Sequence, residues 1–390
     1  MNSKLVSLKR KLKLDLPSGQ SAFLWGARKT GKSTYLGENF PHAIYYDLLK
    51  TDQFTKLLHQ PHLLREEVLA LKAENQLIIL DEVQKNPLLL DEVHWLIENT
   101  SHQFILCGSS ARQLRRAGVN LLGGRAWKFN FFPLVYPEIP NFDLLHALNY
   151  GLLPSHYRQT QAKKSLDAYV GIYLKEEIQA EGLVRNLPAF SKFLEIASLC
   201  NGELINYSNI AQDCGVDSKT VKQYFDILTD TYVGYLIEPY SIRKKRDIIT
   251  KAHKFYFFDT GVSNRLARQH FETLSGMAAG KSFEHWILME LIAYKSLEDK
   301  DQQISFWRSK TGLEVDFVVE SDLALEVKIS PLPKPTDLKG LYAFCEEHSV
   351  KHAVVVCTAE KPRLLTKGPC PIMVLPWQEF LENLWSGYYF

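Results

Sequence analysis

The sequence of 390 residues has no long apolar run and few cysteines. No stretch of about 18 uninterrupted apolar residues occurs, so a membrane-spanning helix is not expected. The basic first 20 residues lack the apolar centre of a signal peptide. The six cysteines are dispersed without a CxxC pair, which argues against zinc ribbons and a disulfide framework. We therefore expect a cytoplasmic protein without a membrane partner.

The chain also lacks an excess of charge of one sign, an internal repeat and any segment biased enough to be disordered. Lys and Arg number 46 against 44 Asp and Glu, so overall charge neither demands nor excludes a nucleic-acid partner. A composition of 46% hydrophobic and 23% charged residues is typical of a folded chain. The length predicts roughly two to three domains.

The first part of the chain alternates short apolar runs with helical segments. Apolar runs at residues 21–25, 43–48, 76–80 and 103–107 predict strands, and residues 32–40 and 88–99 predict helices. Continuous apolar strands that end in polar residues are typical of a parallel sheet covered on both faces. The sequence therefore predicts an α/β domain over residues 1–140.

A complete phosphate-binding motif, GxxxxGK[ST], follows the first predicted strand and precedes the first predicted helix. Its backbone N–H groups would face the phosphates of ATP, its lysine would reach the β and γ oxygens, and its serine would ligate Mg²⁺. Its residues, with the following threonine, are Gly26, Ala27, Arg28, Lys29, Thr30, Gly31, Lys32, Ser33 and Thr34.

Two acids end the buried run at residues 76–80, at the sheet edge where such folds bind ligands. We expect Asp81 to hold Mg²⁺ and Glu82 to orient or deprotonate the attacking water. Ser109 and Ser110 follow the next strand, where a polar group could sense the γ-phosphate. The alternative for either serine is a turn residue that caps the next helix.

An arginine cluster follows these serines. Arg125 is our candidate for an arginine that reaches a neighbouring subunit's γ-phosphate, and Arg112, Arg115 and Arg116 are further candidates. A solvated or salt-bridged surface role is the alternative for each of them.

Several segments together resemble the prokaryotic AAA+ ATPases that carry a C-terminal domain of unknown function. They are LWGARKTGKST, LIILDEVQKNPLLL, ILCGSSARQL with GVNLLGGRAWKFNFFPLVYPEI, YVGIYLKEEIQAEGLVRN and KFYFFDTGVSNRL. The resemblance runs almost from end to end. It implies an AAA+ core and a homo-oligomer, for which a hexamer is one expectation, with ATP sites at the subunit interfaces. It implies no particular substrate.

A helical lid or linker is expected over residues 141–186 and a winged-helix-like region over residues 187–275. Residues 204–214, Gly215 and residues 219–233 predict a helix, a turn and a second helix. Val221, Phe225, Leu228 and Tyr232 would share one buried face. Lys219, Lys222 and Gln223 would then lie outside, near DNA, and a basic loop between two strands would contact phosphates through Arg243, Lys244, Lys245 and Arg246. A packing module with a solvated charge run is the alternative.

The last region, residues 276–390, resembles the PD-(D/E)xK (restriction-endonuclease-like) nuclease fold in its order of elements. Glu284 lies on a predicted helix, Asp316 on a strand, and Glu326 and Lys328 on the next strand. These carboxylates could hold Mg²⁺ while Lys328 steadies phosphate charge. His285 is expected on the helix surface. Nuclease activity does not follow from such a fold alone.

The leading hypothesis is an ATPase that binds and remodels or translocates DNA, including branched DNA. One alternative is a nucleotide-dependent switch that acts on a protein partner. Another is a defence or toxin–antitoxin component.

Overall fold

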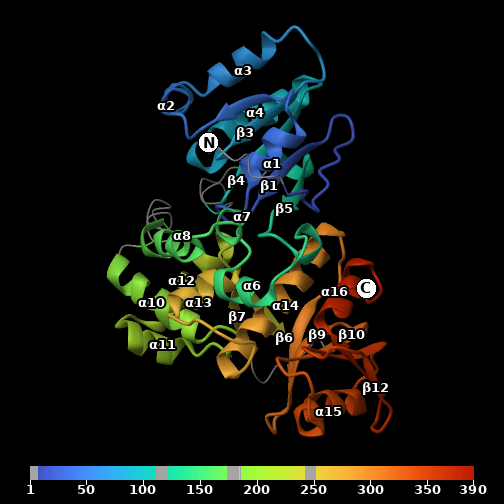
Figure 1. Cartoon of the computed structure of the whole chain (residues 1–390). Helices are drawn as coiled ribbons and strands as arrows, with labels where there is room; N and C mark the ends of the chain where they lie inside the picture. Colours follow the sequence, from blue (N-terminus) through green and yellow to red (C-terminus); the bar gives the residue numbers. More distant parts are fainter. Residues whose placement is uncertain (1–7, 111, 113–121, 174–183, 185, 242–251) are drawn as a thin grey trace. The chain divides into compact units, whose positions relative to one another are not determined.

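The computed structural model of the chain describes residues 8–110, 112, 122–173, 184, 186–241 and 252–390 (Figure 1). These residues form two compact units. Unit 1 comprises Met1–Leu134, Leu153–Ser155 and Ile227–Val233, and unit 2 comprises Val135–Leu152, His156–Asp226 and Gly234–Phe390.

Unit 1 is built on a five-stranded parallel sheet with the strand order β2-β3-β4-β1-β5. Its strands are β1 (Ser21–Trp25), β2 (Ile44–Asp47), β3 (Leu77–Asp81), β4 (Gln103–Gly108) and β5 (Ala126–Asn130). Its helices are α1 (Lys32–Asn39), α2 (Thr51–His59), α3 (His62–Leu69) and α4 (Leu89–Asn99). The apolar runs of the sequence form four of these strands, whereas β5 is an additional edge strand.

The core of unit 1 explains why its central strands are apolar along their whole length. Ile78, Ile79 and Leu80 on β3 and Ile105 on β4 are fully buried, although successive side chains of a strand point to opposite faces. Both faces of the sheet are therefore covered, as the parallel topology requires.

Helices dominate the first part of unit 2. They are α6 (Leu144–Tyr150), α7 (Pro154–Tyr157), α8 (Ala162–Ala168), α10 (Leu187–Leu199), α11 (Tyr207–Cys214), α12 (Ser218–Asp230) and α13 (Thr260–Leu266). Helix α7 begins, and α12 ends, in a segment that belongs to unit 1.

An eight-stranded mixed sheet with the order β12-β13-β11-β10-β9-β8-β6-β7 forms the rest of unit 2. Its strands are β6 (Gly234–Pro239), β7 (Lys254–Phe257), β8 (Ile304–Arg308), β9 (Glu314–Val319), β10 (Leu323–Lys328), β11 (His352–Cys357), β12 (Arg363–Leu365) and β13 (Ile372–Pro376). The helices are α14 (Met277–Leu297), α15 (Lys339–Glu347) and α16 (Trp377–Trp385); α14 packs against β10 and α16 (Figure 1).

The two strands expected for a wing also belong to this larger sheet. β6 and β7 pair as an antiparallel hairpin, and β6 continues as a parallel neighbour of β8. Because sheet pairing crosses residue 276, the hairpin and the C-terminal strands share one sheet.

The structure corrects two sequence expectations. Helix α12 ends at Asp230, and the chain turns through Tyr232 with a left-handed φ of 58°, so Tyr232 packs on the core of unit 1 instead of the helix face. His285 is buried and not on the surface, and its ring nitrogens contact Asn201 and the carbonyl of Phe257. Burial lowers the pKa of His285 to about 4, so the ring is neutral.

Candidate functional site

The phosphate-binding motif forms the turn between β1 and α1. Gly31 takes φ 98°, a left-handed conformation that favours glycine, and Lys32 begins the helix. The Lys32 ammonium group is buried and donates hydrogen bonds to the carbonyls of Gly26 (2.7 Å) and Ala27 (3.1 Å). Thr30 also donates to the Ala27 carbonyl (2.8 Å). The loop is therefore fixed by its own side chains, with the lysine next to the positive end of α1.

Ser33 connects this loop to the carboxyl end of β3. Its hydroxyl donates a 2.6 Å hydrogen bond to Oδ2 of Asp81, and the hydroxyl of Tyr45 on β2 donates to the same oxygen at 2.6 Å. A hydroxyl and a carboxylate at this separation are ligands that Mg²⁺ accepts, so the residues fit an ATP-bound Mg²⁺ ion. Tyr45 was not among the candidates from the sequence, because a tyrosine in an apolar run carries no local signal of this contact.

Glu82 follows Asp81 in the chain and contacts a different group of residues. It is buried, takes a left-handed φ of 60°, and accepts a 2.5 Å hydrogen bond from Nε2 of Gln84. Nε2 also donates to the hydroxyl of Ser109 at 3.1 Å, and Arg28 lies 3.6 Å from the Glu82 carboxylate. The structure thus places Arg28 next to Glu82 and joins Glu82 to Ser109 through Gln84, a residue that the sequence did not indicate.

The other polar residues expected near this edge make different contacts. Ser110 accepts a hydrogen bond from the backbone of Arg112, and Arg112 pairs with Asp230 at 2.6 Å. Arg125 pairs with Glu98 at 2.5 Å and lies next to Ser21, at the opposite end of β1 from the phosphate-binding loop. Arg115 and Arg116 lie outside the described residues.

A second polar cluster lies in unit 2. It contains Glu284 from α14, Asp316 from β9, and Glu326 and Lys328 from β10, as expected from the sequence. β7 supplies Lys254 and Tyr256, which the sequence analysis had placed in the winged-helix region. The Tyr256 hydroxyl donates to Glu284 at 2.6 Å, and Lys328 lies 2.5 Å from Glu326 and 4.0 Å from Asp316.

Burial controls the protonation of this cluster. Desolvation, followed by the nearby Asp316 charge, raises the pKa of Glu284 to about 7 and that of Glu326 well above its ordinary value. Within the described ranges, no three His, Cys, Asp or Glu side chains are placed to hold a metal ion together. In this arrangement Glu284, Asp316 and Glu326 therefore do not fit a shared Mg²⁺ ion.

Comparison with protein families divides the chain into three segments. Residues 18–140 match the family described as AAA domain. This segment is a P-loop AAA domain. It is followed by matches to a domain of unknown function (DUF8612) at residues 141–273 and another (DUF4143) at residues 279–380. A search among curated proteins found no match.

Solved structures with a similar arrangement are distant. A Walker-type ATPase of Pyrococcus abyssi is 14% identical, with a TM-score of 0.42 over 63% of this chain and 90% of that one. The Aeropyrum pernix ORC1 protein in complex with DNA is 12% identical (TM-score 0.29; 65% and 87% covered). A STAND protein with a tetratricopeptide repeat sensor from Pyrococcus horikoshii is 13% identical (TM-score 0.19; 71% and 44%). Such distant likeness indicates no function for this chain.

Outside the AAA domain, the candidate DNA-contacting residues are only partly described. Lys219, Lys222 and Gln223 lie exposed on α12, which begins after the left-handed turn at Gly215 and the cap formed by Asp217. The basic run Arg243, Lys244, Lys245 and Arg246 lies outside the described residues. In the described part of the chain, no helix is long and apolar enough to cross a membrane.

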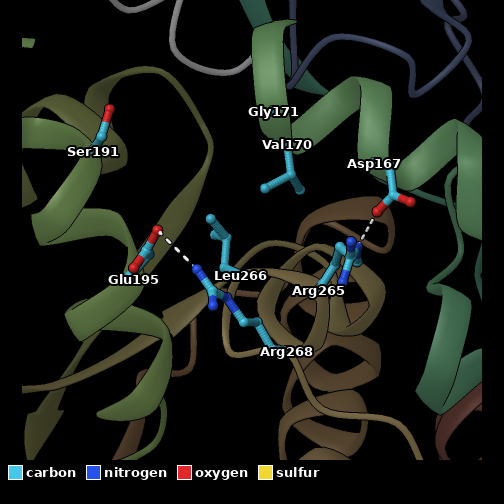
Figure 2. Close-up of a pocket in the computed structure, with 8 residues that line it drawn as sticks. All are labelled: Asp167, Val170, Gly171, Ser191, Glu195, Arg265, Leu266 and Arg268. Carbon is cyan, nitrogen blue, oxygen red and sulfur yellow. Dashed lines mark hydrogen bonds and ion pairs between the residues drawn. The ribbon is translucent and has the colours of Figure 1, made fainter. Parts of the chain in front are cut away.

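Unit 2 also contains a pocket of about 210 Å³ that the sequence did not indicate. Figure 2 shows that its two arginines each point to a carboxylate: Arg265 pairs with Asp167, and Arg268 lies 3.9 Å from Glu195. Because these charges are balanced within the pocket, they do not indicate a charged ligand.

Proposed function

We propose that this chain binds ATP with Mg²⁺ at the phosphate-binding loop of its AAA domain and hydrolyses it. The carrying observation is the 2.6 Å hydrogen bond between Ser33 and Asp81, which connects the loop to the acidic strand end. Lys32 and the helix terminus would bind the phosphates, and Ser33 and Asp81 would hold Mg²⁺. Bound Mg²⁺ would neutralise charge on the phosphates, and Glu82 would accept a proton from the attacking water.

Two substitutions test this proposal. Lys32→Ala should abolish nucleotide binding or turnover, because the phosphates lose their lysine. Glu82→Gln should keep ATP binding and slow hydrolysis, because an amide is a poor proton acceptor. Fluorescent-nucleotide binding and steady-state phosphate release measure the two properties separately. If Glu82→Gln hydrolyses ATP at the parent rate, Glu82 is not the acid that activates water.

We further propose that the ATPase assembles into a homo-oligomer and acts on DNA. Lys219, Lys222 and Gln223 are exposed on the second helix of a helix–turn–helix pair, and the sequence after β6 contains four consecutive basic residues. This basic run can contact the phosphate backbone without reading bases. Arg125 as an arginine finger acting in trans is part of this proposal, and it requires a subunit interface.

DNA stimulation of the ATPase is the direct test. The rate should rise with duplex DNA and rise further with branched DNA, and binding should weaken with salt. Neutralising residues 243–246 to alanine should weaken binding and flatten its salt slope. Replacing the exposed Lys163 and Lys164 of α8 by alanine removes two positive charges elsewhere and should leave both properties unchanged; Lys244→Ala with Lys245→Ala is the test variant that matches this control in charge. An unstimulated rate, together with salt-independent binding, would favour a switch that acts on a protein.

We propose that the chain divides into the four regions expected from the sequence. We also propose that the C-terminal region has a restriction-endonuclease-like core. The element order α14, β8, β9, β10, α15 and β11 supports this proposal, since a helix, three strands, a helix and a strand are the order that such a fold needs. The carboxylates do not fit a shared metal ion, so we assign no cutting reaction to them.

A further inference from the structure

The polar cluster in unit 2 draws on two segments that match different families. Glu284, Asp316 and Glu326 lie in the segment at residues 279–380, whereas Lys254 lies in the segment at residues 141–273. The pairing of β6 with β8 places the β6–β7 hairpin in the same sheet as β9 and β10. Lys254 therefore reaches the carboxylates from outside the region whose sequence resembles a nuclease.

Lys254 is buried and surrounded by acids. Its side chain is 5% exposed, and its ammonium group pairs with Glu314 and lies 3.8 Å from Glu284. Glu314 is two residues from Asp316 on β9, so both side chains point to the same face of the sheet. A single ammonium group thus contacts carboxylates of α14 and β9.

Lys328 compensates the remaining acids. Its ammonium group lies between Glu326 (2.5 Å) and Asp316 (4.0 Å), and Asp316 also accepts a 2.8 Å hydrogen bond from the backbone of Val327. Each carboxylate of the cluster therefore has a cationic partner within the protein. Burial disfavours charge on Lys254, but Glu284, Asp316 and Glu314 outweigh it and raise its pKa above the ordinary value.

We infer that Lys254 takes the place that a divalent cation would have in this cluster, so that the site is compensated by lysine and binds no metal. A metal ion would have to displace a buried ammonium group from its carboxylates. That exchange leaves the ammonium group buried without its partners, which is costly. This inference does not depend on ATP binding in unit 1.

With Lys254 present, we expect the cluster to bind no Mn²⁺. The full chain would carry Asp81→Asn, which removes the carboxylate expected to hold Mg²⁺ at the ATP site, and would be studied without nucleotide. Mn²⁺ is titrated, and its binding is measured by electron paramagnetic resonance and by the melting temperature. Neither measurement should show an Mn²⁺ site in unit 2. Mn²⁺ binding that disappears in Asp316→Asn would overturn the inference.

Removing the lysine should open the site. In the same background, Lys254→Met leaves the acids uncompensated, so we expect a lower melting temperature that Mn²⁺ restores as its concentration rises. Adding Glu284→Gln to this variant should cancel the restoration. Lys281→Met is a matched control, because Lys281 lies on α14 and pairs with the exposed Glu203, and it should gain no Mn²⁺ binding.

Two further results decide the inference. If Lys254→Met folds and gains no Mn²⁺ binding, the lysine does not take the place of a metal and the inference fails. If Lys254→Met does not fold, Lys254→Gln provides the same removal of charge with a polar group of similar length, and its Mn²⁺ titration gives the decision.

Discussion

Nε2 of Gln84 donates hydrogen bonds to Glu82 at 2.5 Å and to Ser109 at 3.1 Å. One buried amide thus joins the acid after β3 to the serine after β4. Oε1 of Gln84 has no hydrogen-bond partner among the described residues and lies so close to Gly108 that a Cβ there would approach it to 2.4 Å. Nε2 faces the carboxylate, so the side-chain amide of Gln84 has one orientation. In that orientation its N–H group holds the Glu82 carboxylate in place.

Gln84→Leu should lower kcat for ATP roughly tenfold or more, with little change in KM. The substitution removes the donor that orients Glu82 but none of the groups that would bind phosphates, and general bases contribute about 10² to 10⁴ in rate. Steady-state kinetics measures both constants. Gln103→Leu is the control, because Gln103 bonds backbone carbonyls at the other end of β4. Equal kcat values for Gln84→Leu and the parent would refute a positioning role for Gln84.

Tyr45→Phe should raise the Mg²⁺ concentration needed for half-maximal ATPase activity by roughly tenfold. The Tyr45 hydroxyl orients Asp81 through a 2.6 Å hydrogen bond, and a bond to a charged group contributes about 1.5 to 3 kcal/mol. Burial and the Asp81 charge raise the pKa of Tyr45, so the phenol stays protonated and donates. Activity measured across a Mg²⁺ series provides the test.

Tyr46→Phe is the matched control for Tyr45. Its hydroxyl contacts Glu67 at 3.1 Å instead of Asp81, so the Mg²⁺ requirement should not change. A shift of the same size in both variants would mean that the effect comes from the strand, and Tyr45 would then have no specific role at the metal.

Asp259→Ala should destabilise unit 2 by about 2 to 3 kcal/mol. The buried Asp259 carboxylate caps α13 by accepting from Val262 (3.0 Å) and also accepts from the backbone of Leu152 (2.7 Å). Its loss leaves two buried N–H groups unpaired. The melting temperature checks this, and Asp213→Ala on the exposed side of α11 should leave it unchanged. An equal melting temperature for Asp259→Ala and the parent would contradict the capping role.

Local sequence pattern predicted four strands of the AAA domain, because these are continuous apolar runs, and the helices α1 and α4, but it did not predict the helices α2 and α3. It missed β5, a short edge strand whose Trp127 is 46% exposed and whose run AWKFN is not continuously apolar. It also missed the contribution of Lys254, because that contact depends on pairing between β6 and β8, which are far apart in sequence. Gln84 lies in a 3₁₀ turn (Val83–Lys85), where no periodic pattern marks a contact between strand ends.

The stability of unit 2 should fall as pH rises from about 5 to 8, and Glu290 is one cause. Glu290 is buried and accepts hydrogen bonds from Tyr136 and Trp385, each at 2.9 Å. Burial raises its pKa to about 8, so the folded protein holds a proton that the unfolded chain releases above its ordinary pKa of 4.5. The stabilisation is therefore complete below that ordinary value and is lost as pH rises towards 8, by at most about 1.4 kcal/mol per pH unit.

Melting temperatures of the parent and Glu290→Gln across this pH range measure the contribution. Glutamine stays neutral at every pH, so the variant should lose less stability than the parent between pH 5 and 8. The pH dependence of stability that remains in this variant would include the contribution of Glu284. Burial raises the pKa of Glu284 to about 7, so its contribution also falls as pH rises. Glu298→Gln, at the exposed end of α14, should keep the full slope of the parent. Parallel pH profiles for the parent and Glu290→Gln would show that Glu290 is not a source of the pH dependence.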